Sequence, residues 1–171
     1  MDRYVHHELR SVGTASAAVA VCVPVTAGVH GAPLDAGGLG LFAAGLLGFA
    51  VLFTLAQASR IRWLSEVLDF EAAEPLATPP AAASSLRHPV NWWLFTVMTA
   101  GTLGAALAWE PAAALFPLWP AAAWLGQAWL AAGWERRHGK VLWRGHDPDR
   151  PWRLAVSPRP LPRTATGAPP E

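Results

Sequence analysis

The sequence predicts an all-α integral membrane protein, with four transmembrane helices in two antiparallel hairpins and an amphipathic cytoplasmic helix between them. Three observations lead to this fold class. Residues 11–34, 36–59, 89–109 and 111–134 form four runs without a formal charge. Each run is long enough to cross a bilayer about 30 Å thick, which takes roughly 20 mostly apolar residues. Finally, a water-soluble bundle would need a charged face on each helix, and these runs have none.

The distribution of basic residues predicts the orientation. All 13 Lys and Arg residues lie in the N-terminal tail, in the central segment, or beyond residue 134. Four spans place these three regions on one side of the membrane, and the positive-inside rule makes that side cytoplasmic. A cleaved signal peptide ending near residues 29–31 is the competing interpretation. It is disfavoured because the leader mixes acidic with basic residues and the apolar run is long. The Ala-, Gly- and Pro-rich composition resembles that of bacteria with GC-rich genomes, which implies a plasma membrane.

The first hairpin is predicted over residues 12–59, after a cytoplasmic tail of residues 1–11. Its first span, at about residues 12–29, contains Pro24, which favours a kink. Its second span, at about residues 38–58, carries Gly40, Ala44 and Gly48 at four-residue spacing. Such a ridge lets another backbone approach closely, so it predicts helix packing within the chain, with self-association into a homo-oligomer as the alternative.

The central segment, residues 60–88, combines an amphipathic helix with a flexible cytoplasmic linker. Between residues 60 and 71 the apolar side chains fall on one half of a helical wheel, with Arg62, Ser65, Glu66 and Asp69 on the other. An in-plane helix at the membrane surface fits this pattern, and the alternatives are a cytoplasmic extension of the second span or a docking helix for a partner. Residues 72–85 are rich in Ala, Pro, Ser and Thr, which is typical of a linker.

The second hairpin is predicted over residues 89–136, and tryptophans mark its boundaries. Indole prefers the headgroup level, so Trp92, Trp93 and Trp134 should lie at one interface and Trp109 and Trp119 at the other. The third span has its own ridge of small residues. That ridge comprises Ala100, Gly104 and Ala108.

Gln127 is the most polar residue near the middle of the fourth span. Its amide should turn inward, because in lipid it would leave donors and an acceptor unpaired. Antiparallel pairing places it near Thr99 and Thr102, so a bond to a hydroxyl or carbonyl of the third span is predicted. The alternative is that Gln127 lines a substrate path.

The C-terminal tail, residues 137–171, is basic, Pro-rich and expected to be largely disordered. A small β-hairpin around the turn-forming residues 145–149 is plausible on sequence grounds, with Trp143 and Trp152 on its strands. A lone two-stranded unit is only marginally stable unless it packs against something else.

Chemical motifs are scarce, and this limits the functional classes. The centres of the predicted spans lack an ionisable residue, which disfavours an ion-coupled pump. Nucleophile and base motifs, phosphate-binding loops and Cys clusters are absent, so we expect no catalysis, cofactor or metal. The basic residues are too few and too close to the membrane to indicate nucleic acid.

The sequence therefore predicts a non-catalytic, multi-pass plasma-membrane protein. Its partners would be the lipid bilayer and a membrane or cytoplasmic protein, which it would engage as an accessory or scaffold subunit through its cytoplasmic segments. The alternative is a small oligomeric transporter or flippase-like protein for a neutral or lipidic substrate.

Overall fold

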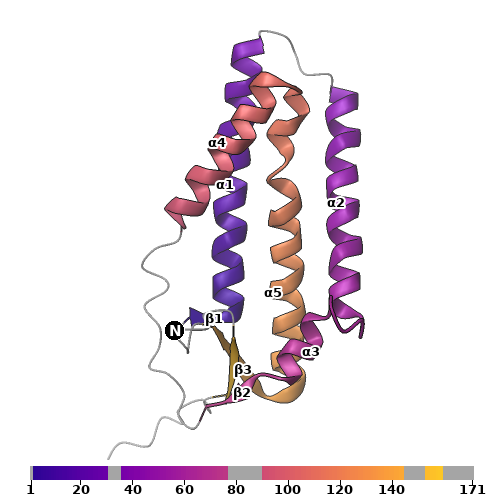
Figure 1. Cartoon of the computed structure of the whole chain (residues 1–171), viewed down its shortest axis with the longest axis vertical. Coiled ribbons are helices and arrows are strands. Elements are labelled where there is room, and N and C mark those ends of the chain that lie inside the picture. Colours follow the sequence, from indigo (N-terminus) through magenta and orange to yellow (C-terminus); the bar gives the residue numbers. More distant parts are fainter. Residues whose placement is uncertain (1, 31–35, 77–89, 145–152, 160–171) are drawn as a thin grey trace, which may run out of the picture.

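The computed structural model describes residues 2–30, 36–76, 90–144 and 153–159. The chain is mostly helical, with four long helices standing side by side and a small sheet below one end of them (Figure 1). The all-α prediction therefore needs a correction, because four short strands are present. The predicted linker beyond Leu76, the predicted turn at residues 145–149 and the chain after Arg159 lie outside the described residues.

Helix α1, Tyr4–His30, begins well before the predicted first span. Its buried residues recur every three or four positions, which places them on one stripe facing the bundle. This stripe starts at Tyr4 and Glu8, so the N-terminal residues are part of the folded core and not a separate tail. Pro24 lies inside the helix, as the sequence requires.

The other long helices are α2, Ala36–Ala58, α4, Trp92–Ala108, and α5, Leu118–His138. Asn91 caps α4 by accepting a hydrogen bond from the backbone N–H of Leu94 at 3.2 Å. A 3-10 helix, η2 (Pro111–Leu115), connects α4 to α5. Helix α5 ends at Gly139, whose φ of 64° is the left-handed conformation that glycine adopts without strain.

The helices do not pack as two sequential hairpins. The main helix contacts join α1 to α4, α1 to α5 and α2 to α5, so α5 lies between α1 and α2 (Figure 1). Each helix of a predicted hairpin thus packs chiefly against a helix of the other one. A physical reason is that Tyr4 of α1, Gln57 of α2 and Gln127 of α5 all form hydrogen bonds with Glu66 of the central segment.

The sheet has the strand order β1-β3-β4-β2 and draws on distant parts of the chain. Strands β3, Lys140–Arg144, and β4, Leu154–Pro158, pair antiparallel, so a hairpin forms close to the predicted place. Strand β1, Asp2–Arg3, pairs antiparallel with β3, and β2, Glu74–Pro75, pairs parallel with β4. The hairpin therefore has the additional packing that a two-stranded unit needs.

The central segment forms a shorter helix than predicted. Helix α3, Glu66–Glu71, is only six residues long, and Ser65 caps it. Trp63 is 81% exposed, whereas Phe70 is 1% exposed and contacts the rings of Tyr4 and Trp134. We call the end of the molecule formed by α3, the sheet and the adjoining helix ends the polar cap.

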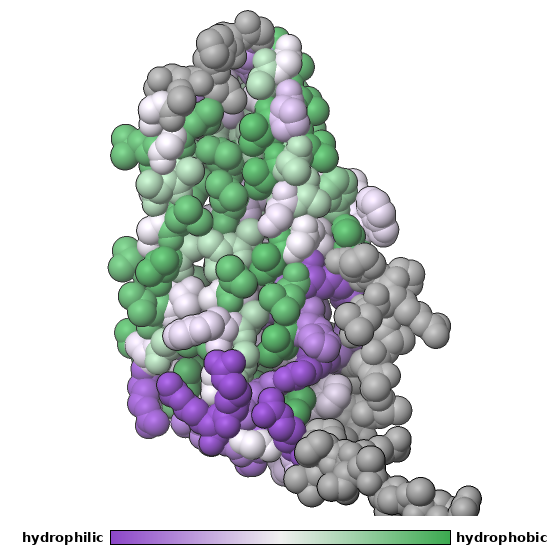
Figure 2. All heavy atoms as spheres, turned by 180° about the vertical axis from the view of Figure 1, so that it is seen from behind, coloured by the Kyte–Doolittle hydropathy of each residue, from purple (hydrophilic) through white to green (hydrophobic). Residues whose placement is uncertain are grey.

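Among the described residues, two helices are long and apolar enough to cross a membrane, judged by length and composition alone. They are residues 4–30 and 37–58, whereas α4 is apolar but has 17 residues. Figure 2 shows hydrophobic residues covering the helical part of this face and hydrophilic residues gathering at the polar cap.

One contact fixes the level at which α4 begins. The N–H of Asn91 donates to Thr14 Oγ1 at 3.1 Å, which places Trp92 and Trp93 beside Thr14, about 15 Å along α1 from Tyr4. Trp134 instead lies near Tyr4 and is 9% exposed. The expectation that Trp134 shares an interface with Trp92 and Trp93 is therefore wrong, because Trp134 belongs to the core of the polar cap.

Candidate functional site

The carboxylate of Glu66 is the point where four segments of the chain meet. Its Oε2 accepts a hydrogen bond from the Tyr4 hydroxyl of α1 at 3.3 Å. Its Oε1 is approached by two amides, Gln57 Nε2 of α2 at 3.5 Å and Gln127 Nε2 of α5 at 3.3 Å. Ser65 positions Glu66 by starting α3 at this residue. A single side chain thus connects α3 with the three helices α1, α2 and α5.

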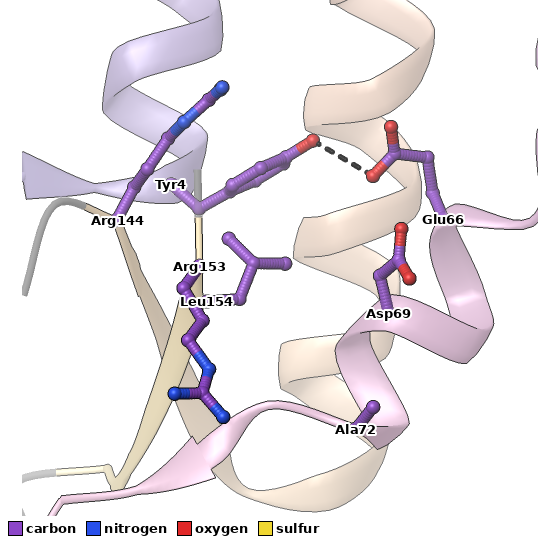
Figure 3. Close-up of a pocket in the computed structure, with 7 residues that line it drawn as sticks. All are labelled: Tyr4, Glu66, Asp69, Ala72, Arg144, Arg153 and Leu154. Carbon is purple, nitrogen blue, oxygen red and sulfur yellow. Dashed lines mark hydrogen bonds between the residues drawn. The ribbon is translucent and has the colours of Figure 1, made fainter. Parts of the chain in front are cut away.

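A cleft of about 510 Å³ lies beside this carboxylate. Figure 3 shows Tyr4 and Glu66 pointing toward each other across it, with Asp69 on the same wall as Glu66. Arg144 and Arg153 come from the opposite wall, at the sheet. The wall formed by α3 therefore carries two acidic side chains, whereas both arginines of the opposite wall are ion-paired elsewhere, Arg144 with Glu8 and Arg153 with Glu74.

The surroundings of Glu66 favour its neutral form. Burial raises the pKa of this carboxyl above its ordinary value, and the nearby charge of Asp69 raises the pKa further. The hydrogen bond from Tyr4 and the charge of Arg144 lower the pKa, but they do not reverse the shift. Protonation of Glu66 therefore occurs at a higher pH than for a carboxyl in water.

Two acidic side chains that are almost fully buried hold the sheet against the bundle. Glu8 of α1 is 2% exposed and pairs with Arg144 of β3, Oε1 to Nη1, at 3.2 Å. Glu135 of α5 is 1% exposed and pairs with Arg3 of β1. Glu135 Oε1 also accepts the N–H of Leu142 at 3.0 Å. A buried carboxylate needs such partners, because removing one partner leaves an uncompensated charge.

The ridge predicted on the second span lies on the outside of α2. Gly40, Ala44 and Gly48 are exposed. Within the described part of the chain, a Cβ built on Gly40 or Gly48 would have no neighbouring atom within 4 Å. These residues therefore face away from the other helices of this chain, and the structure of a single copy leaves the self-association alternative open.

The ridge predicted on the third span has the same outward placement. Ala100, Gly104 and Ala108 are exposed, whereas Thr102 and Ala106 of the same helix are buried. The physical reason is that α4 packs on α1 through the face that carries Thr102 and Ala106. Small residues alone did not indicate which face turns inward.

Gln127 turns inward as predicted, but its partner is different. Its amide donates to Glu66 of α3 and not to the third span, because α5 packs against α1 and α2 and not mainly against α4. Thr102 is buried, and the Thr99 hydroxyl is buried without a partner among the described residues. The Thr99 carbonyl lies 3.8 Å from Cys22 Sγ of α1.

Sequence reasoning missed Tyr4, Glu8, Glu66, Glu135 and Arg144. The helical pattern puts Glu66 on the polar face of its helix, and the other four residues lie in predicted tails or at predicted span ends. One signal was available: Glu8 and Glu135 each adjoin a long apolar run, where an acidic residue requires a partner. The sequence did not show which arginines supply it.

In the described ranges, no three His, Cys, Asp or Glu side chains are grouped in a way that could hold a metal ion. Comparison with protein-family models, curated proteins and solved structures found no match to this chain.

Proposed function

We propose that this protein crosses the plasma membrane four times, with both termini in the cytoplasm, and acts as a non-catalytic accessory or scaffold subunit. The observation that carries the proposal is the composition of the sheet. Strands from the N-terminus, the central segment and the C-terminal region lie in one sheet at one end of the bundle. Four spans are the arrangement that brings these three regions to one side of a membrane.

The lengths of α1 and α4 support this topology. The part of α1 from Thr14 to His30 is about 25 Å long, and so is α4. Both lengths are slightly less than the roughly 30 Å thickness of the hydrocarbon layer. Local thinning of the bilayer accommodates a difference of this size. Large apolar side chains on the outside of α2 and α4 would face lipid. They include Leu41, Leu47, Phe49, Val51, Leu52, Leu55, Val97 and Leu107.

The polar cap supports the scaffold role. A subunit that holds a partner needs a surface of defined shape, and buried ion pairs specify one arrangement of α1, α5 and the sheet. The cap also lies beside the predicted membrane surface, where a cytoplasmic or membrane partner would meet it. The lack of a recognisable catalytic motif in the sequence agrees with a non-catalytic role.

Reporter fusions test the topology. Fusions after Asp35, Ala77, Glu110 and Glu171 should report outside, inside, outside and inside, in that order. An outside signal at Ala77 or Glu171 would refute the four-span proposal.

Affinity purification in mild detergent tests the scaffold role. Wild type should retain a protein partner that Phe70→Ala loses and Trp63→Ala keeps. Identical recovery from both variants would contradict a role for the cap.

One observation favours the alternative of a small transporter or flippase-like protein for a lipidic substrate. An apolar cavity of about 510 Å³ lies between α2, α4 and the start of α5, lined by Leu46, Phe49, Met98, Phe116 and Trp119 among others. A cavity at this depth could hold an acyl chain. Reconstitution in liposomes with fluorescent lipid analogues would support the alternative if lipid exchange between leaflets exceeded that of empty liposomes.

A further inference from the structure

A second cleft, of about 670 Å³, lies between the end of α2, α3 and the end of α5. Arg60 contributes to one wall, and Arg136 and Arg137 with His138 contribute to the other. Within the described part of the chain, Arg136 and Arg137 make neither a hydrogen bond nor an ion pair through their side chains. The cleft therefore presents guanidinium groups whose hydrogen-bonding capacity is unused.

Its other charged residues leave the cleft net positive. Glu71 is the acidic residue of the lining, and it pairs with Arg60 through an exposed contact of 3.5 Å. The Nδ1 of His138 is bonded to the Trp134 carbonyl at 2.9 Å. The charges of Arg136 and Arg137 thus remain uncompensated. The dipole of α5 favours cations at its C-terminus, but it does not explain a third arginine across the cleft.

Apolar stripes lead into the cleft along both of its helical walls. On α2, Val51 and Leu55 are 59% and 61% exposed, and they share a face with Ala58, which lines the cleft. On α5, Leu125 and Trp129 are 52% and 68% exposed and share a face with Gly133, another lining residue. Each stripe runs from the apolar part of the bundle to the arginines.

We propose that this cleft binds the phosphate group of an anionic phospholipid, whose acyl chains lie along the stripes of α2 and α5. Arginine suits the anion because its planar guanidinium can donate two hydrogen bonds to a phosphate. Trp129 lines the cleft where the apolar stripe of α5 meets the arginines, and an indole ring is favoured at such a boundary between apolar chains and headgroups. The inference rests on the membrane placement proposed above, but not on the scaffold role.

Native mass spectrometry of the protein in mild detergent tests the site. Wild type should bind phosphatidylglycerol more tightly than phosphatidylcholine with the same acyl chains. Arg136→Gln combined with Arg137→Gln should weaken phosphatidylglycerol binding about 25-fold, from about fivefold per arginine near a membrane surface. Both positions are exposed, so we expect thermal unfolding of the variant to match wild type.

The matched control removes two positive charges elsewhere on the same end of the molecule. Arg62 and Arg159 are exposed and do not line the cleft, so Arg62→Gln with Arg159→Gln should retain binding. Equal loss in both double variants, or equal affinity for the two lipids, would overturn the site. Inorganic phosphate that displaces the lipid at equal concentration would overturn the lipid assignment in favour of free phosphate. The reporter fusions measure topology separately, so failure of the lipid site is distinguishable from failure of the membrane proposal.

Discussion

The upper part of the bundle and the polar cap are held together by different kinds of contact. Near the tops of α1 and α4 the buried cluster consists of small side chains, with Cys22, Ala106, Ala113 and Ala114 at its centre. The cluster in the cap contains Tyr4, Phe70, Trp134 and Leu142, with buried ion pairs around it. The first pattern is typical of helices that associate in lipid, and the second of a water-soluble core.

This difference shows where substitutions should matter. In lipid, helices gain little from burying apolar area, so a large apolar residue on the bundle's outer face carries little folding energy. In the cap, removal of an aromatic ring leaves a cavity, and both the lost burial and the cavity lower the free energy of unfolding.

The largest effect is expected for Phe70→Ala, which removes a ring that is 1% exposed between Tyr4 and Trp134. It should lower the free energy of unfolding of the cap by about 3–5 kcal/mol. The matched control is Trp63→Ala in the same segment, where the ring is 81% exposed and the loss should stay within about 0.5 kcal/mol. Chemical unfolding in mild detergent measures both. Equal losses would show that the cap does not have the core described here.

A smaller loss is expected when the buried carboxylate of Glu135 is removed. Glu135→Leu leaves the N–H of Leu142 without its acceptor and Arg3 without its ion pair. About 2–3 kcal/mol of the free energy of unfolding should be lost. Glu71→Leu removes an exposed acid paired with Arg60 and should change that free energy by less than about 0.5 kcal/mol. A double-mutant cycle that finds no coupling energy between Arg3 and Glu135 would show that the ion pair does not cause this loss of stability.

Two glycines should respond oppositely to alanine. A Cβ on Gly126 would lie 2.3 Å from Thr54 Oγ1, so Gly126→Ala should destabilise the contact between α2 and α5 by about 1–3 kcal/mol. Gly48→Ala meets open space in a single copy and should be neutral or stabilising by up to about 1 kcal/mol. Thermal unfolding compares them, and Thr54→Ala should partly rescue Gly126→Ala. A strongly destabilised Gly48→Ala would instead support self-association through the outer ridge.

The smallest effect is a dependence of stability on pH. Because the folded pKa of Glu66 is raised, its contribution to stability is complete below its ordinary pKa and is lost as the pH rises through the folded pKa. Wild type should therefore lose stability across that interval more than Glu66→Gln does, and unfolding curves at several pH values measure the difference. An identical pH dependence in both proteins would show that Glu66 is not the titrating group.

The sequence predicted the parts of the fold that depend on composition. Long runs without charge indicated the helices, and the predicted end of the second hairpin at residue 136 lies two residues before the observed end of α5 at His138. The inward turn of Gln127 also followed from physical reasoning, since a buried amide needs partners. The partner of Gln127 could not be predicted in this way, because hydropathy does not show that α5 packs beside α1 and α2.

The candidate site was harder to predict because its residues come from separate segments. Strands β1 and β2 have two residues each, which is too short for any alternating pattern. Tyr4 and Glu66 are 62 positions apart, and neither lies in a recognisable motif. The two ridges of small residues did not indicate the inward faces of α2 and α4, for a related reason. Ala and Gly occur on several faces of α2 and α4, so their spacing alone did not identify the inward side, and the close approach between α2 and α5 occurs at Thr54 and Gly126 instead.

Cysteine cross-linking across β1 and β3 tests the central claim, that the N-terminal and C-terminal regions form one cap on the cytoplasmic side. Asp2 and Arg144 are directly opposite in an antiparallel pair, where Cα atoms are about 4.5–5.5 Å apart and a disulfide can form. With Cys22→Ala and Glu8→Gln as background, so that the loss of Arg144 leaves no unpaired buried carboxylate, Asp2→Cys with Arg144→Cys should cross-link under a membrane-impermeant oxidant in inside-out vesicles but not in intact cells. Asp2→Cys with Glu110→Cys should not cross-link in either. Cross-linking from the outer face, or none in inside-out vesicles, would contradict the account.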